Sequence, residues 1–419
     1  MIKINKLIKL LNNNNINTYQ ITNTITNDSE MFFDRGKLET IRKVSTNEIL
    51  VQIFTEDGDT QGQADFVISK DLSTKEINEL IATAILSSKL VHNKKYELVK
   101  GEKRQSYKYK DELEDSYTIL QKISKIYFDL EEENLKFNSL ECFFKERTTT
   151  IINSNNVNLS KKTYRINVEA IPSYYSKDFK TELYRMFNYD KLDYDKIKED
   201  VIKSLNDLRN RGKAIKFDQN IKTNVILRAP EIRELFTEYI DNFNYADVYF
   251  ESNLAKVGDV LQTSAKTKLN LSLDKRTKAD FFDNEGIILK KLSLIEDGKL
   301  VSYYGSQRFA SYLNLKATGD LTKIVLKNGT NSIDNLRKEP YIELIDLSGL
   351  QVDAYSSYIG GEVRLAIYFD GTKTYPISGF SFSGNLNEVI NNMELSKEKE
   401  MINDYEGPSF MKIPNIEII

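Results

Sequence analysis

Apolar residues recur along the chain with two periods, one typical of helices and one typical of strands. The helical period is clearest in residues 229–243, APEIRELFTEYIDNF. Six apolar residues there fall at the i, i+3, i+4, i+7, i+8 and i+11 positions of one helical face, and Pro230 suits the first turn, where its missing N–H needs no partner. The opposite face is polar, so it is either a solvated surface or the remnant of a polar site. The apolar face consists of Ile232, Leu235, Phe236, Tyr239, Ile240 and Phe243.

The first 110 residues predict an α+β domain. Residues 1–15 are expected to form a short helix, and residues 31–69 alternate like strands with a hairpin turn at Asp57-Gly58. Ser73 followed by Glu76 is a capping box that opens a helix. The charged stretch 93–112 is expected to be a linker or an exposed loop.

Residues 111–220 predict a second domain made of a helix, two strands and a helix. The helical patterns cover about residues 113–130 and 193–211, and an asparagine-rich turn at 153–158 divides the strands between them.

Residues 221–419 predict a large β-rich C-terminal domain. A strand at 223–228 leads into the helix described above, and hairpins turn at Asp297-Gly298 and Asp370-Gly371. A short helix at 386–393 and a last strand in the tail complete the pattern. The predicted fold class is therefore α+β, with N-terminal α/β sandwich-like units followed by a large β-rich domain.

Composition narrows the class of function. The 59 basic and 62 acidic residues give a net charge of −3, which provides no basic footprint for nucleic acid. We see no apolar run of the ~20 residues that a membrane span needs, nor a secretory leader. The single cysteine, Cys142, excludes an intramolecular disulfide and fits a reducing compartment. We expect a cytoplasmic protein without a membrane anchor.

The scarcity of imidazole and thiol limits catalysis. His92 is the only histidine, which excludes zinc sites built on two histidines but leaves a Ser–His–Asp triad formally open. Cys142 alternates with aromatic residues in a predicted strand and is expected to be a buried small apolar residue. Asp283 and Glu285 are either an acid–base pair or, as we expect, residues that hold a turn.

Three segments resemble the TldD/TldE family, in which the TldE type is also called PmbA and which is also known as the modulator-of-gyrase peptidase group. Residues 32–43, FFDRGKLETIRK, look like the strand pair of its first domain. Residues 281–320, beginning FFDNEG, are similar to its Phe-Asp-x-Glu-Gly stretch and the following hairpin. Residues 360–393 resemble its C-terminal signature, with Asp-Gly, Tyr-Pro-Ile and Gly-Asn-Leu in order.

The resemblance implies which positions a zinc site would occupy. TldD-type chains carry His-Glu-x-x-x-His on a helix and a cysteine near the C-terminus, whereas TldE-type chains lack these ligands. In this sequence the two histidine positions fall on Thr237 and Asn242, or on Glu238 and Phe243, and the cysteine position falls close to Glu406. The chain therefore resembles the TldE type, without a cofactor of its own, and zinc is expected only in a TldD-type partner.

The function implied by this resemblance is that of a non-catalytic subunit that pairs with a TldD-like metallopeptidase to form a chamber in which unfolded peptides are degraded or matured. Arg308 is a candidate for contacting peptide in the cleft. Two alternatives remain: a homodimeric peptide-binding or scaffold protein, and a hydrolase with an unorthodox site that uses Glu238. Whether the chain is an enzyme stays open at this point.

Overall fold

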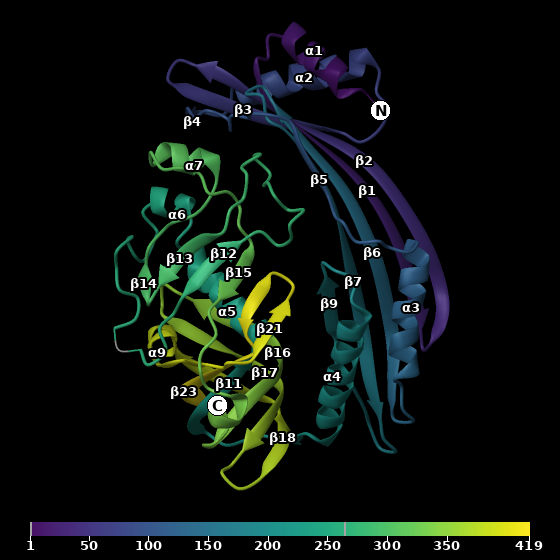
Figure 1. Ribbon diagram of the computed structural model, residues 1–419, viewed down its shortest axis with the longest axis vertical. Helices are drawn as coiled ribbons and strands as arrows, with labels where there is room; N and C mark the ends of the chain where they lie inside the picture. The colour runs from purple at the N-terminus through teal and green to yellow at the C-terminus, as the bar shows by residue number, and fades with distance from the viewer. Residues whose placement is uncertain (1, 264) are drawn as a thin grey trace.

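The computed structural model describes residues 2–263 and 265–419, and it confirms the predicted α+β class. The strands of these residues form three sheets (Figure 1). One long curved sheet belongs to the N-terminal half, residues 2–213, and the other two belong to the C-terminal half, residues 215–419. No helix in the described part of the chain is long and apolar enough to cross a membrane.

The nine-stranded sheet has the order β4-β3-β2-β1-β6-β7-β5, with β8 and β9 also pairing with β7. Neighbouring strands are antiparallel except for β5 and β7, and the predicted hairpin between β2 and β3 is confirmed, with Gly58 at a φ of 53°. The strands are β1 (Thr18–Asp34), β2 (Lys37–Asp57), β3 (Thr60–Ile68), β4 (Asn93–Lys94), β5 (Gln105–Lys108), β6 (Leu135–Asn153), β7 (Asn158–Tyr175), β8 (Lys180–Glu182) and β9 (Arg185–Tyr189).

Four helices cover one face of this sheet, in two pairs at its two ends. Helices α1 (Ile4–Asn13) and α2 (Thr74–Ser88) pack on Ile21 of β1, and α3 (Ser116–Asp129) and α4 (Tyr194–Lys213) pack on Met31 of the same strand. Successive residues of a strand point to opposite faces, so these odd-numbered positions of β1 share the covered face. The capping box that opens α2 is confirmed, and side chains of aspartate cap α3 and α4.

The expected linker at 93–112 is wrong in part, because it contains two short strands. Residues of β4 extend the sheet beside β3, and β5 pairs in parallel with β7. The two strands are short and pair through their backbones, and the side chains that anchor the segment, such as Leu98 and Tyr109, are too widely spaced to give an apolar alternation.

The C-terminal half packs helix α5 (Ala229–Asp241) between its two sheets. The predicted apolar face of α5 is confirmed, since all six of its residues are buried in the largest apolar cluster. Further helices are α6 (Tyr245–Tyr249), α7 (Gln307–Tyr312), α8 (Ile333–Leu336) and α9 (Leu386–Asn392).

The larger sheet of this half is eight-stranded and the smaller one is six-stranded, in the order β14-β13-β12-β15-β22-β21. The predicted turn at Asp297-Gly298 is confirmed by the left-handed φ values of both residues, 47° and 78°. The strands of the larger sheet are β10 (Ile215–Lys216), β11 (Ile221–Arg228), β16 (Tyr341–Asp353), β17 (Tyr358–Phe369), β18 (Thr374–Ser378), β19 (Phe380–Asn385), β20 (Glu394–Leu395) and β23 (Phe410–Ile418). Those of the smaller sheet are β12 (Leu271–Asp274), β13 (Leu292–Glu296), β14 (Lys299–Leu300), β15 (Lys323–Leu326), β21 (Lys399–Ile402) and β22 (Tyr405–Pro408).

The apolar clusters give each predicted unit a core of its own. One cluster lies under α1 and α2, a second lies under α3 and α4, and the largest fills the C-terminal half. The first two rest on one continuous sheet, which runs across the boundary expected at residue 110. The division into three domains stays a prediction.

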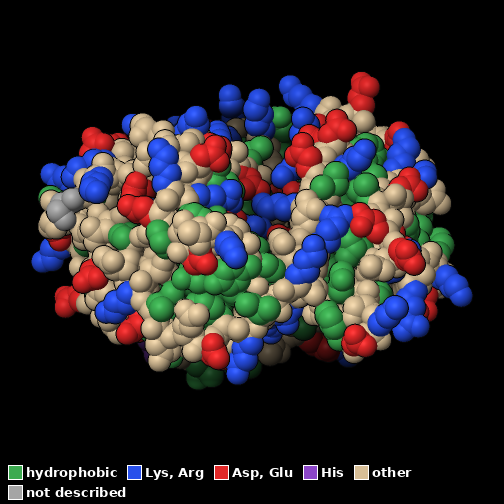
Figure 2. Space-filling view, turned by 90° about the horizontal axis from the view of Figure 1, so that it is seen from below, with side chains coloured by type: hydrophobic (Ala, Val, Ile, Leu, Met, Phe, Trp, Pro, Cys, Tyr) green, Lys and Arg blue, Asp and Glu red, His purple; other side chains and the backbone are tan. Residues whose placement is uncertain are grey.

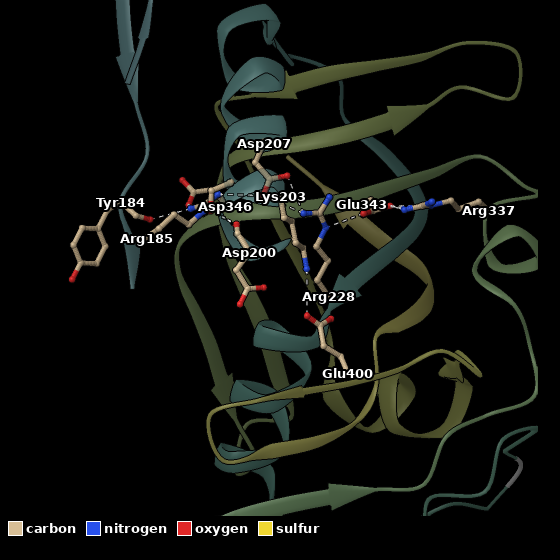
Figure 3. A network of polar contacts seen from close by, with 11 residues as sticks. Tyr184, Arg185, Asp200, Lys203, Asp207, Arg228, Arg337, Glu343, Asp346 and Glu400 are labelled. Atoms are coloured by element: carbon tan, nitrogen blue, oxygen red, sulfur yellow. Dashed lines mark hydrogen bonds and ion pairs between the residues drawn. The ribbon is translucent and has the colours of Figure 1, made fainter. Parts of the chain in front are cut away.

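A network of charged side chains joins the two halves (Figure 3). Arg228, at the end of β11, donates to Asp207 of α4 at 3.1 Å and to Glu343 of β16 at 2.9 Å. Arg185 of β9 donates to Asp346 of β16 at 2.7 Å and lies 3.6 Å from Asp207. Seen from below, charged side chains also line the hollow between the halves (Figure 2).

We expect Arg228→Met to lower the free energy of unfolding by about 3–5 kcal/mol, because it leaves Asp207 and Glu343 with one fewer counter-charge in a buried place. The measurement is urea unfolding followed by circular dichroism. Lys75→Met is the control: Lys75 forms an exposed pair with Glu79 at 4.0 Å, and its loss should cost less than about 0.5 kcal/mol. Equal effects of the two changes would contradict a stabilising role for the network.

Candidate functional site

The exposed face of α5 carries two of the sequence-predicted site residues. Thr237 and Glu238 are both exposed, and the Thr237 hydroxyl donates to the carbonyl of Arg233 at 2.9 Å, one turn earlier in the helix. Arg233, on the same helix, forms an ion pair with Asp404 in the turn between β21 and β22. This face of α5 is polar and exposed at Thr237 and Glu238.

Asn242 points the other way and is part of the interior. Its side chain is 5% exposed, its amide nitrogen donates to the Tyr239 carbonyl at 2.7 Å, and its amide oxygen accepts from the Leu254 N–H at 3.2 Å. Phe243, the position in the other register, is also buried. Asn242 therefore ties the end of α5 to the following loop.

Glu406 lies in β22, on the face of the six-stranded sheet that points away from α5. Its neighbour Tyr405 is fully buried in the core beneath α5, and side chains alternate along a strand. Across the sheet, Glu406 is level with Val325, which pairs with Ser272 on β12. The structure therefore brings Thr237 and Glu238 together on one surface and places Glu406 on another.

Two lysines fix the charge of Glu406. Lys323 and Lys399 donate to its two oxygens at 2.6 Å and 2.5 Å, and these hydrogen bonds lower the pKa of Glu406 to about 2. The carboxylate lines an open groove of about 550 Å³ on the outer face of the sheet. Charged residues, serines and asparagines form most of the groove, so the surface offers hydrogen bonds and charge more than apolar contact. The serines and asparagines are Asn270, Ser272, Ser293 and Asn328.

The residues at the positions implied for zinc do not fit that metal. The amide of Asn242 is already bonded on both sides, and Glu406 is held by two cations that would repel a metal ion. Within residues 2–263 and 265–419, no three His, Cys, Asp or Glu side chains gather closely enough to hold a metal. No step of catalysis is therefore derived through zinc in this chain.

The other candidates from the sequence are dispersed. His92 is exposed just after α2. Cys142 is fully buried in β6, as expected, and burial raises the pKa of its thiol. Asp283 is buried and holds a turn, as expected, by accepting from the N–H groups of Glu285 at 3.0 Å and Ile287 at 2.9 Å.

Arg308 and Glu285 line a second hollow, a cavity of about 210 Å³ between the two halves. Three glutamines of the N-terminal sheet face the same cavity, Gln20, Gln52 and Gln63. Sequence reasoning missed these glutamines. A signal was present for Gln52, which interrupts the apolar run of residues 49–54, whereas Gln20 and Gln63 stand in strands with many other polar residues.

Glu231, in the first turn of α5, is a further residue that the sequence did not single out. One of its carboxylate oxygens is closed off from solvent and has no hydrogen-bond partner, and burial raises the pKa of Glu231 to about 7 despite nearby Arg228 and Arg185.

Comparison with known proteins gives a match over the C-terminal half. Residues 220–419 match the family described as PmbA/TldA metallopeptidase C-terminal domain. No curated protein matches the sequence.

Solved structures share the fold over nearly the whole chain. TldE from Thermococcus kodakarensis is 15% identical, with a TM-score of 0.78 over 99% of this chain and 98% of that one. A proposed modulator of DNA gyrase from Thermotoga maritima is 12% identical, with a TM-score of 0.77 over 99% of both chains. Another from Bacteroides thetaiotaomicron is 14% identical, with a TM-score of 0.80 over 99% and 97% of the two chains.

We expect Asn242→Ala to lower the free energy of unfolding by about 1–3 kcal/mol, because the change removes the buried acceptor of the Leu254 N–H. Thr237→Ala is the control, and should stay within about 0.5 kcal/mol, since that hydroxyl is exposed. Urea unfolding of both variants measures the difference. If Asn242→Ala is as mild as Thr237→Ala, the amide does not tie the helix end to its loop.

Glu406→Gln should destabilise the protein by about 1–3 kcal/mol at pH 7 and by progressively less in acid. The pKa of Glu406 is lowered in the folded state, so its stabilisation is present above the ordinary value of 4.5 and is lost as the pH falls toward about 2. Urea midpoints of wild type and variant at pH 7, 5 and 3.5 test this. A difference that stays constant with pH would contradict the lysine clamp.

Proposed function

We propose that the chain is a TldE-like, non-catalytic subunit of a TldD-type zinc peptidase, and the match of residues 220–419 to the PmbA/TldA metallopeptidase C-terminal domain supports this. The observation that carries the proposal is what the residues at the implied ligand positions bind in this structure. Thr237 and Asn242 offer a hydroxyl and a committed amide, and Glu406 is neutralised by two lysines. Zinc sites in proteins instead use thiolate, imidazole and carboxylate ligands.

In this proposal the chain closes a chamber with its partner and handles peptides without cutting them itself. Strand β21 lies at the edge of the six-stranded sheet, beside the groove that holds Glu406 and Lys399. An extended peptide that adds to such an edge is held by its backbone, so it is recognised by shape more than by sequence. Unfolded peptides are the substrate class that fits, and the cytoplasm, with its reducing conditions, is the compartment we propose.

Co-expression with TldD-type chains tests the pairing. We expect the two chains to co-purify as a complex whose mass equals the sum of its parts, and we expect cleavage of an unstructured peptide by the complex but not by this chain alone. Glu238→Ala, in this chain, should leave the cleavage rate of the complex within about twofold, because Glu238 is exposed.

Two results would overturn the proposal. One is peptide cleavage by the purified chain alone that is lost in Glu238→Ala, which would favour the hydrolase. The other is stoichiometric zinc bound beside α5 in an anomalous-scattering map.

A further inference from the structure

The cavity of about 210 Å³ lies where the N-terminal sheet meets the C-terminal half. Its walls come from β1, β2 and β3 on one side, from the segment that contains Tyr96 between β4 and β5, and from the start of α7 on the other side. Its volume exceeds the ~150 Å³ that accommodates benzene and falls below the ~300 Å³ at which pockets for drug-sized ligands begin. It is therefore the size of a very small organic molecule.

Glu285 contributes an unpaired negative charge to this cavity. Its Oε2 atom accepts the N–H of Gln307 at 2.6 Å. In the described part of the chain no basic side chain forms an ion pair with it, and burial, with Asp283 nearby, raises the pKa of Glu285 to about 7. A partly buried carboxylate without an ion-pair partner loses part of its hydration, which makes it a suitable partner for a cation that enters from solvent.

Arg308 contributes an unpaired positive charge to the same cavity. Its Nε donates to the Tyr312 hydroxyl at 3.2 Å and its Nη2 donates to Asn93 Oδ1 at 2.7 Å, and both acceptors are neutral. Among residues 2–263 and 265–419, no carboxylate forms an ion pair with this guanidinium. These two hydrogen bonds orient Arg308 and leave Nη1 available to a ligand.

The remaining walls combine hydrogen-bonding groups with an apolar surface. The hydroxyls of Tyr96 and Ser306 line the cavity, and neither makes a hydrogen bond to another described residue. Phe54 and Leu98 add an apolar wall. A complementary ligand therefore carries two opposite charges, a few polar atoms and a small apolar part.

We propose that this cavity binds a free α-amino acid, with the ammonium group at Glu285 and the carboxylate at Arg308. An amino acid satisfies both unpaired charges at once, and a small aliphatic side chain suits the wall of Phe54 and Leu98. The site goes beyond the proposed subunit role and does not depend on it. It lies between the two halves, away from α5 and from the groove at Glu406.

Isothermal titration calorimetry on the full-length chain alone tests the proposal, with L-leucine, N-acetyl-L-leucine and L-leucinamide as probes. We expect L-leucine to bind, and each blocked analogue, which lacks one charge, to bind about 10-fold or more weakly. Glu285→Gln should weaken L-leucine by a similar factor but leave N-acetyl-L-leucine unchanged. Arg308→Gln should weaken L-leucine but leave L-leucinamide unchanged.

Matched controls separate this result from general damage. Glu79→Gln and Arg364→Gln remove the same charges from exposed places and should bind L-leucine like the wild type. Thermal melting checks the fold of each variant, and Arg308→Lys, which keeps the charge, replaces Arg308→Gln if that variant does not fold.

Two outcomes would overturn the proposal: no heat of binding for L-leucine at millimolar concentration, or equal binding of all three probes. Co-purification with a TldD-type chain is a separate measurement, so either proposal can fail while the other stands.

Discussion

The two halves are joined by a network of buried charged side chains, in which Arg185 bonds Asp346 across the boundary. A second bond across this boundary is made by the guanidinium of Arg228. It belongs to the C-terminal half and lies between Asp207 of the N-terminal half and Glu343 of its own half, while Arg337 bonds the second oxygen of Glu343 at 3.0 Å. Buried ion pairs contribute little net free energy of folding when compared with apolar residues of the same size. They do require an accurate geometry, because a displacement leaves a buried charge without its partner. The network therefore constrains the orientation of the two halves more than it adds stability.

The alternation of side chains along β22 explains why the positions implied for metal ligands are not gathered here. Tyr405 turns inward to the core beneath α5, so Glu406 must turn outward, and Asn242 at the end of α5 turns into the protein. Both polar side chains serve the structure instead, since Asn242 holds a loop and Glu406 holds two lysines. The chain thus shares its fold with TldE and contains α5 and the six-stranded sheet. The residues at the implied ligand positions make hydrogen bonds and ion pairs within the protein.

Local signals in the sequence predicted most elements of the fold. The capping box at Ser73, the turn at Asp297-Gly298 and the apolar face of α5 each follow from chemistry within a few residues, and all three are confirmed. Pairings between distant segments could not be predicted from such local signals. Strand β5, for example, has no apolar alternation and pairs with β7 through its backbone.

The candidate site was predictable only in part, for the same reason. Arg308 and Glu285 were each noticed, but they are not adjacent in sequence, and Gln20 is more than 260 residues from Asn284, whose carbonyl its side chain contacts. No spacing rule joins such residues, because the fold of both halves brings them together. The order of the matching segments along the chain nevertheless indicated the resemblance to the TldD/TldE family. The family match of residues 220–419 confirms that resemblance.

Burial raises the pKa of two carboxyl groups, those of Glu231 and Glu285. Three cations lie near Glu231, namely Arg228, Arg185 and Lys203, and each lowers its pKa, yet burial outweighs them and the pKa stays near 7. Glu285 reaches the same value by burial beside Asp283 and Asp320, which raise its pKa further, although the N–H groups of Gln307 and Arg308 lower it. Because two opposite electrostatic surroundings lead to the same pKa, removal from water is the dominant influence on both carboxyl groups. Glu231 lies in the first turn of α5, where one of its carboxylate oxygens is closed off from solvent and has no hydrogen-bond partner. Glu285, by contrast, lines a cavity, and a cation bound there would favour the charged form of the carboxylate and lower its pKa.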